Sequence, residues 1–86
     1  MDINELISIV KTKLQSQIII QNIKIEDKSF LHKGHKSNDE NKFHLKITLI
    51  SSELSGLNKI DSNRKIYKIL EKELNKYIHS LQILIN

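Results

Sequence analysis

Hydrophobic residues recur at helical spacing in the first part of the chain. They lie three or four positions apart, as on one face of an α-helix: Ile3, Leu6, Ile7, Val10 and Leu14. Asp2 precedes this series and can cap a helix or complement its dipole. The pattern therefore predicts a helix over residues 2–15.

Two later segments alternate apolar and polar residues with a period of two. In residues 18–27 the apolar positions of one parity are Ile19, Ile23 and Ile25. In residues 44–51 they are Leu45, Ile47 and Leu49. Alternation of this kind is typical of half-buried strands. The polar, aperiodic residues 31–42 between them predict a long loop, and loops of that length are usually functional or disordered.

The remaining third of the chain predicts a turn, a helix and a strand. Residues 52–59 are read as a short helical turn with a bend, and residues 78–85 as a third strand. Between them a helix is expected from Asp61 or Ser62 to Tyr77, with one apolar face: Ile66, Tyr67, Leu70, Leu74 and Tyr77. The order α-β-β-α-α-β predicts an α/β (α+β) fold in which helices pack in one layer on a three-stranded mixed sheet, as one domain over residues 1–86.

Composition narrows the function classes. The chain has no cysteine, which excludes disulfides, thiolate metal sites and cysteine nucleophiles. Its two glycines are too few for a phosphate-cradling loop, and no catalytic triad or two-carboxylate hydrolytic site is evident, so we expect no enzyme activity. No membrane span or targeting signal is apparent, which favours a cytoplasmic location. The net charge of +4 permits a polyanionic partner without requiring one.

Histidines are the main candidates for chemistry, because imidazole is the commonest neutral metal ligand. His32 and His35 lie in the predicted loop, His44 opens the second strand, and His79 stands near the start of the third. By strand parity His79 shares a face with Leu81 and the apolar residues beyond it, where packing alone favours valine or isoleucine. Each histidine taken singly also fits an ordinary surface or structural role.

Basic residues form a second candidate site on the last predicted helix. Four lysines fall within a narrow arc opposite its apolar face: Lys65, Lys68, Lys72 and Lys76. The stripe fits either a solvated face or a surface for phosphates or an acidic partner. Arg64 stands at the helix start, where a cation opposes the helix dipole, and this favours an anion or partner contact.

From His44 to Ile83 the sequence resembles the core signature of the BolA family, without a gap. The matching segments are His44-Leu45-Lys46-Ile47, Ser51, Leu54-Ser55-Gly56, Arg64-Lys65-Ile66-Tyr67, Leu70-Glu71-Lys72-Glu73-Leu74 and Ile78-His79-Ser80-Leu81. Upstream, Asp27-Lys28-Ser29 resembles the family's Asp-x-Ser, and His32-Lys33-Gly34-His35 its histidine-containing loop. The chain departs from the signature where leucine replaces phenylalanine, at Leu45 and Leu54, and where Ser62-Asn63 replaces an Arg-His pair.

The resemblance implies a fold like a type II KH domain and a monothiol glutaredoxin as partner. The two proteins would share a bridged 2Fe–2S cluster, with His79 as the first ligand from this chain. A loop histidine would be the second, His35 or His32 ahead of His44. The isolated chain would bind no cluster, and it would be a monomer or at most a weak dimer.

The alternative function is that of a DNA-binding transcriptional regulator of stress response or cell morphology, supported by the KH-like element order, the positive charge and the lysine stripe. Since Gly56 stands alone, the Gly-x-x-Gly loop of RNA-binding KH domains is absent.

Overall fold

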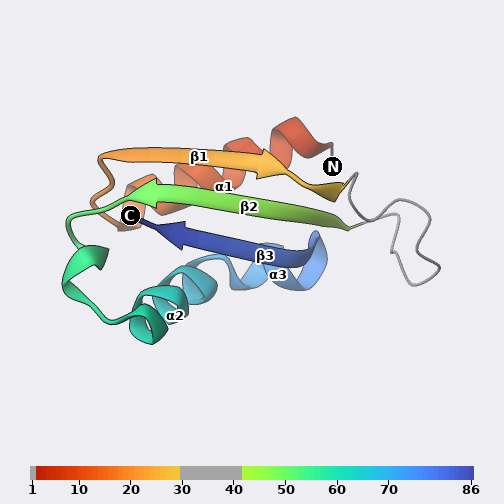
Figure 1. Ribbon diagram of the computed structural model, residues 1–86. Coiled ribbons are helices and arrows are strands. Elements are labelled where there is room, and N and C mark those ends of the chain that lie inside the picture. Colours follow the sequence, from red (N-terminus) through yellow and green to blue (C-terminus); the bar gives the residue numbers. More distant parts are fainter. Residues whose placement is uncertain (1, 30–41) are drawn as a thin grey trace.

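The computed structural model describes residues 2–29 and 42–86 (Figure 1). Its elements along the chain are helix α1 (Ile3–Gln17), strands β1 (Asn22–Asp27) and β2 (Phe43–Ile50), the 3-10 helix η2 (Leu54–Gly56), helices α2 (Lys59–Ile69) and α3 (Glu71–Lys76), and strand β3 (Ile78–Ile85). The sheet order is β1-β2-β3, with β1 antiparallel and β3 parallel to β2. The predicted α+β class and three-stranded mixed sheet are therefore confirmed.

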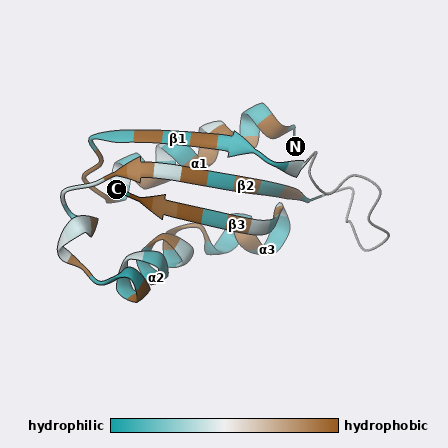
Figure 2. Cartoon of the chain, in the orientation of Figure 1, coloured by the Kyte–Doolittle hydropathy of each residue, from teal (hydrophilic) through white to brown (hydrophobic). Residues whose placement is uncertain are grey.

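The hydrophobic core lies between the central strand and the helices. In Figure 1, α1 runs behind the sheet while α2 and α3 lie alongside β3, and none of the described elements covers the opposite face of the sheet. The buried apolar residues are Leu6, Val10 and Leu14 of α1, Leu45, Ile47 and Leu49 of β2, Ile66 of α2, Ile78 of β3, and Ile18, Leu54 and Leu70 between or beside these elements. Colouring by hydropathy shows the C-terminal parts of β2 and β3 as strongly hydrophobic (Figure 2).

Helix α1 follows the predicted periodicity closely. The carboxylate of Asp2 accepts a hydrogen bond from the backbone N–H of Glu5 at 2.8 Å, which satisfies one of the free N–H groups of the first turn. The helix extends to Gln17, two residues beyond the prediction, since the N–H of Ile18 still donates to the carbonyl of Leu14 at 2.9 Å.

Strand β1 begins at Asn22, so the prediction of a strand from Ile18 is wrong for its first four residues. The cause is the length of its partner: Asn22 pairs with Ile50, the last residue of β2, and residues further upstream have no strand opposite them. The segment is held by side chains instead. The hydroxyl of Ser51 donates to the carbonyl of Ile19 at 2.6 Å, while the Ile19 side chain is 62% exposed.

The single helix predicted from Asp61 or Ser62 to Tyr77 is two helices. Helix α2 starts earlier, at Lys59, because the side chain of Asn58 caps it by accepting the N–H of Asp61 at 2.8 Å. The helix then stops before Leu70, whose φ of −97° and ψ of 14° leave the helical region. Apolar residues keep their spacing of four across this break, so the pattern gave no sign of it.

No helix within the described residues is long and apolar enough to cross a bilayer. The predicted cytoplasmic location and monomeric state stay predictions.

Candidate metal-ligating site

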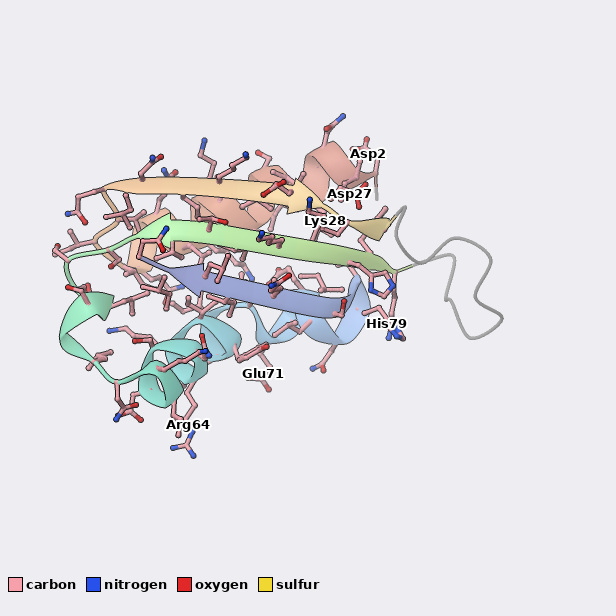
Figure 3. All side chains as sticks on the ribbon, viewed as in Figure 1. Asp2, Asp27, Lys28, Arg64, Glu71 and His79 are labelled. Atoms are coloured by element: carbon pink, nitrogen blue, oxygen red, sulfur yellow. The ribbon has the colours of Figure 1, made fainter. Side chains whose placement is uncertain are left out.

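Two histidines meet at the end of the sheet where β2 and β3 begin. The ring centroids of His44 and His79 are 4.9 Å apart, with an angle of 53° between the ring planes. His44 is almost fully buried, with 5% exposure, whereas His79 is exposed. Figure 3 shows His79 at this end of the molecule, away from the helix α2 that carries Arg64.

A β-bulge in β3 presents His79. Phe43 pairs with Ile78, but the next residue of β2, His44, pairs with Ser80. His79 is thus the extra residue, without a counterpart in the ladder. Bulges commonly redirect a side chain near functional sites. Here the bulge moves the His79 ring out of the regular alternation of the strand.

The prediction that His79 shares the core-facing side of Leu81 is wrong. Ile78 is buried, Leu81 is partly buried, and His79 between them is exposed. The extra residue shifts the alternation by one position, so odd-numbered residues face the core only after the bulge. Position 79 is therefore not a core position, and packing does not favour valine or isoleucine there.

Hydrogen bonds to three residues, Lys28, Ser29 and Ser80, hold His44 in position. Its backbone N–H donates to Ser29 Oγ at 3.1 Å, and its carbonyl accepts the N–H of Lys28 at 2.7 Å. Its ring Nδ1 is hydrogen-bonded to Ser80 Oγ at 2.6 Å. Ser29 is held in turn by Asp27, whose carboxylate accepts the Ser29 N–H at 2.9 Å in an Asx-type turn. The Asp-x-Ser motif thus orients His44, and such partners of a ligating histidine tune both its orientation and its basicity.

An ion pair lies beside this turn. Lys28 Nζ contacts the Glu26 carboxylate at 3.1 Å. The pKa of Glu26 is held below its ordinary value, chiefly by the hydrogen bond from Lys28 and further by the charges of Lys24 and Lys46. A carboxylate kept ionised here balances part of the local lysine charge.

The other two predicted ligands, His32 and His35, lie outside the described residues. Within residues 2–29 and 42–86, no three histidine, aspartate or glutamate side chains come together as a metal site. The described part of the chain thus offers a pair of imidazoles, and the member beside His79 is His44, which the sequence ranked third.

The lysine stripe is not one continuous row, because the break at Leu70 divides it between α2 and α3. Lys65 forms an ion pair with Glu53, which also accepts the backbone N–H of Ile19 at 3.2 Å. The hydrogen bond from Lys65, followed by that from Ile19, holds the pKa of Glu53 below its ordinary value. Arg64 and the other three lysines, Lys68, Lys72 and Lys76, are exposed.

Sequence reasoning missed two residues, one that contacts the site and one in the helix that leads to it. Ser80 was read only as part of a strand, yet it binds the His44 ring. Glu73 is buried in α3, the helix that leads into the bulge, and accepts hydrogen bonds from Lys13 Nζ at 2.9 and 2.7 Å. A glutamate at an apolar helix position was the available signal, but its partner lies sixty residues away in sequence.

Comparison with known proteins gives consistent matches over most of the chain. The family model described as BolA-like protein matches residues 14–86. The protein BOLA1, chloroplastic, of Arabidopsis thaliana is 30% identical over 77 residues, which cover 86% of this chain and 48% of the relative. The DNA-binding transcriptional regulator BolA of Haemophilus influenzae is 28% identical over 75 residues, covering 87% and 70%.

Solved structures give the same result. The BolA domain of SufE1 from Arabidopsis thaliana superposes with a TM-score of 0.79 at 26% identity, covering 92% of this chain and 87% of that domain. The chain spans about half the length of the chloroplastic relative, so it corresponds to part of that protein.

Proposed function

The chain belongs to the BolA-like family, and on this basis we propose that it is a non-catalytic partner of a monothiol glutaredoxin, with which it shares a bridged 2Fe–2S cluster in cluster assembly, transfer or iron regulation. The observation that carries the proposal is the pair of imidazoles 4.9 Å apart, His44 and His79, at one end of the sheet.

The donor set fits such a cluster. Two histidines can replace two thiolates on one iron of a 2Fe–2S centre, as in Rieske proteins, and this raises its reduction potential. When bound, the cluster would supply one-electron transfer and transferable iron and sulfide. Since the chain has no cysteine and the described site offers two imidazoles, the thiolates for the other iron have to come from the partner.

The surrounding residues give the two histidines different roles. His44 is buried and oriented by Ser80 and Ser29, so it supplies a fixed ligand. His79 is exposed on the bulge, so it supplies the ligand that faces a docking partner. The loop histidines His35 and His32 stay as predicted alternatives for the second ligand.

The test is to mix the purified chain with a cluster-loaded monothiol glutaredoxin and to record visible absorption and circular dichroism. We expect the wild type to change both spectra and His79→Ala to leave the glutaredoxin spectra unchanged. His35→Ala and His44→Gln, compared in parallel, identify the second ligand. Identical spectra for the wild type and His79→Ala would refute the proposal.

Two further variants separate ligation from folding. Deletion of His79 joins Ile78 directly to Ser80 and gives a strand with regular alternation, so we expect a folded domain without the spectral change. Ser80→Ala keeps both imidazoles but removes the hydrogen bond to His44, and loss of such a partner typically weakens metal binding about 10- to 100-fold. Far-UV circular dichroism checks the fold of each variant.

We propose DNA binding as a second function, supported by the name of the Haemophilus influenzae relative and by the exposed basic residues of α2 and α3. Affinity for duplex DNA should then fall steeply with salt, by a slope of about 0.9 per phosphate contact in a log–log plot. The variant Lys68→Glu/Lys72→Glu should bind more weakly, whereas Lys11→Glu on α1 should not. Equal binding by the two variants would rule out this surface.

A further inference from the structure

The outer edge of β3 carries backbone groups that pair with no other described residue. Asn86 N–H donates to the carbonyl of Leu49 in β2 at 3.0 Å, and Tyr67 Oη donates to the carbonyl of Leu81 at 3.2 Å from the opposite side. Since backbone groups alternate sides along a strand, the N–H and C=O groups of even-numbered residues of β3 point toward β2. Those of odd-numbered residues point toward the outer edge of the sheet. Beyond Leu81, the N–H and C=O groups of Ile83 and Ile85 therefore point away from the sheet, and no hydrogen bond from residues 2–29 or 42–86 reaches them.

An open groove of about 440 Å³ runs beside these groups. One wall is the outer edge of β3 at Ile83 and Ile85, and the other is formed by η2 and the first turns of α2, including Leu57, Lys59 and Asn63. The groove thus combines an unpaired strand edge with a helical wall, which is the setting in which proteins bind an extended peptide as an added strand.

The side chains of the groove favour an apolar ligand with a negative charge. The large apolar side chain of Leu57 is 42% exposed to solvent. Lys59 is exposed and, among the described residues, pairs with no carboxylate. A ligand that fills the space beside Leu57 and ends in a carboxylate would match both.

We infer that this groove binds an extended, largely apolar peptide segment of another protein, which adds to the outer edge of β3 and places a carboxylate at Lys59. The N–H and C=O groups of Ile83 and Ile85 would supply up to four backbone hydrogen bonds. The inference is independent of the histidine site, which lies at the opposite end of β3.

Two other occupants fit the groove less well. A nucleic acid strand needs several cations for its phosphates and aromatic side chains for its bases, but the groove lining contains one lysine and no aromatic residue. A second copy of the chain would present the same groove side chains, none of which is a carboxylate for Lys59.

The test uses a fluorescein-labelled six-residue peptide of alternating threonine and valine with a C-terminal aspartate. Fluorescence anisotropy should rise with protein concentration, and the amide NMR signals of Ile83 and Ile85 should shift and exchange more slowly with solvent. The same peptide with all of its backbone amides N-methylated has no N–H to donate to the carbonyls of Ile83 and Ile85, so it should bind at least tenfold more weakly. Equal binding of the two peptides would overturn the proposal, as would the absence of binding at millimolar protein.

Matched surface variants locate the site. Leu57→Ser and Lys59→Glu should each weaken binding about tenfold. Ile60→Ser and Lys72→Glu, which change an exposed residue of the same type outside the groove, should change it less than twofold. Equal loss in the groove variants and their controls would overturn the proposal.

One competitor and one dilution experiment distinguish the other occupants. An eight-nucleotide single-stranded DNA should not displace the peptide, and dilution of the protein alone should leave the Ile83 and Ile85 signals unchanged. Displacement by the DNA would point to a nucleic acid, and concentration-dependent signals would point to a second copy; either result contradicts the proposal. His79→Ala should bind the peptide normally, so this test is separate from that of the shared cluster.

Discussion

The ion pair between Lys13 and Glu73 makes an asymmetric prediction about stability. The Glu73 side chain is 5% exposed and receives both of its hydrogen bonds from Lys13, whereas the Lys13 side chain is 35% exposed. Removing the lysine leaves a buried carboxylate without its partner. Removing the glutamate leaves a lysine that can turn its ammonium group into water. The two single variants should therefore differ, although they break the same pair.

The structure sets the size of this difference. Breaking a fully buried pair by removing one partner costs about 3–5 kcal/mol, and an exposed pair contributes about 0–1 kcal/mol. Because this pair is buried on one side only, we expect Lys13→Met to lower the free energy of unfolding by about 2 kcal/mol, between those limits. Glu73→Met should lower it by less than about 1 kcal/mol, since methionine fills the buried space with an apolar chain of similar length.

Urea denaturation followed by far-UV circular dichroism measures these changes. With an m-value of about 1 kcal/mol per molar for a small domain, Lys13→Met should move the midpoint down by about 2 M. The double variant Lys13→Met/Glu73→Met should recover most of that loss, because no buried charge remains. Equal losses in the two single variants, or a double variant as unstable as Lys13→Met, would refute the reasoning.

Two further predictions concern the connection between α1 and β1. Ser51 Oγ donates to the carbonyl of Ile19 and accepts the N–H of Leu54 at 3.1 Å in a buried position, so Ser51→Ala should lower the free energy of unfolding by about 1–3 kcal/mol in urea titrations, while Ser52→Ala nearby should have little effect. The pKa of Glu53 is lowered in the folded state by the hydrogen bond from Lys65, so its contribution is present above the ordinary carboxylate pKa of about 4.3 and is lost as pH falls through the lower folded value. Thermal unfolding between pH 6 and pH 3 should thus show a smaller acid destabilisation for Glu53→Gln than for the wild type, and parallel curves would contradict this.

The helical core and the order of elements could be predicted because they depend on local periodicity. The buried residues of α1 repeat every four positions, and the buried apolar residues of β2 repeat every two, so each segment's own sequence indicates its secondary structure. The start of β1 could not be predicted in this way, since it depends on where β2 ends. The break at Leu70 leaves the apolar spacing intact and is equally invisible in the pattern.

The candidate site shows the same limit. His79 was identified from its residue type and from the family resemblance, but its orientation depends on the register between β3 and β2, which the sequence of β3 alone does not contain. His44 ranked low because a histidine at a strand start is usually a surface residue. Its contact with His79 arises only when a parallel strand from the end of the chain is placed beside it.

The bulge in β3 acts on the strand as a single-letter insertion acts on a reading frame. Without His79 the sequence from Ile78 would alternate regularly between core-facing and solvent-facing residues. His79 adds one residue to the strand, and the same alternation resumes from Ser80. Position 79 therefore belongs to neither the core-facing nor the solvent-facing series of the strand. Its side chain is free to change under selection for chemistry, to a thiol or a carboxylate as well as an imidazole, without any adjustment in the residues that hold the domain together.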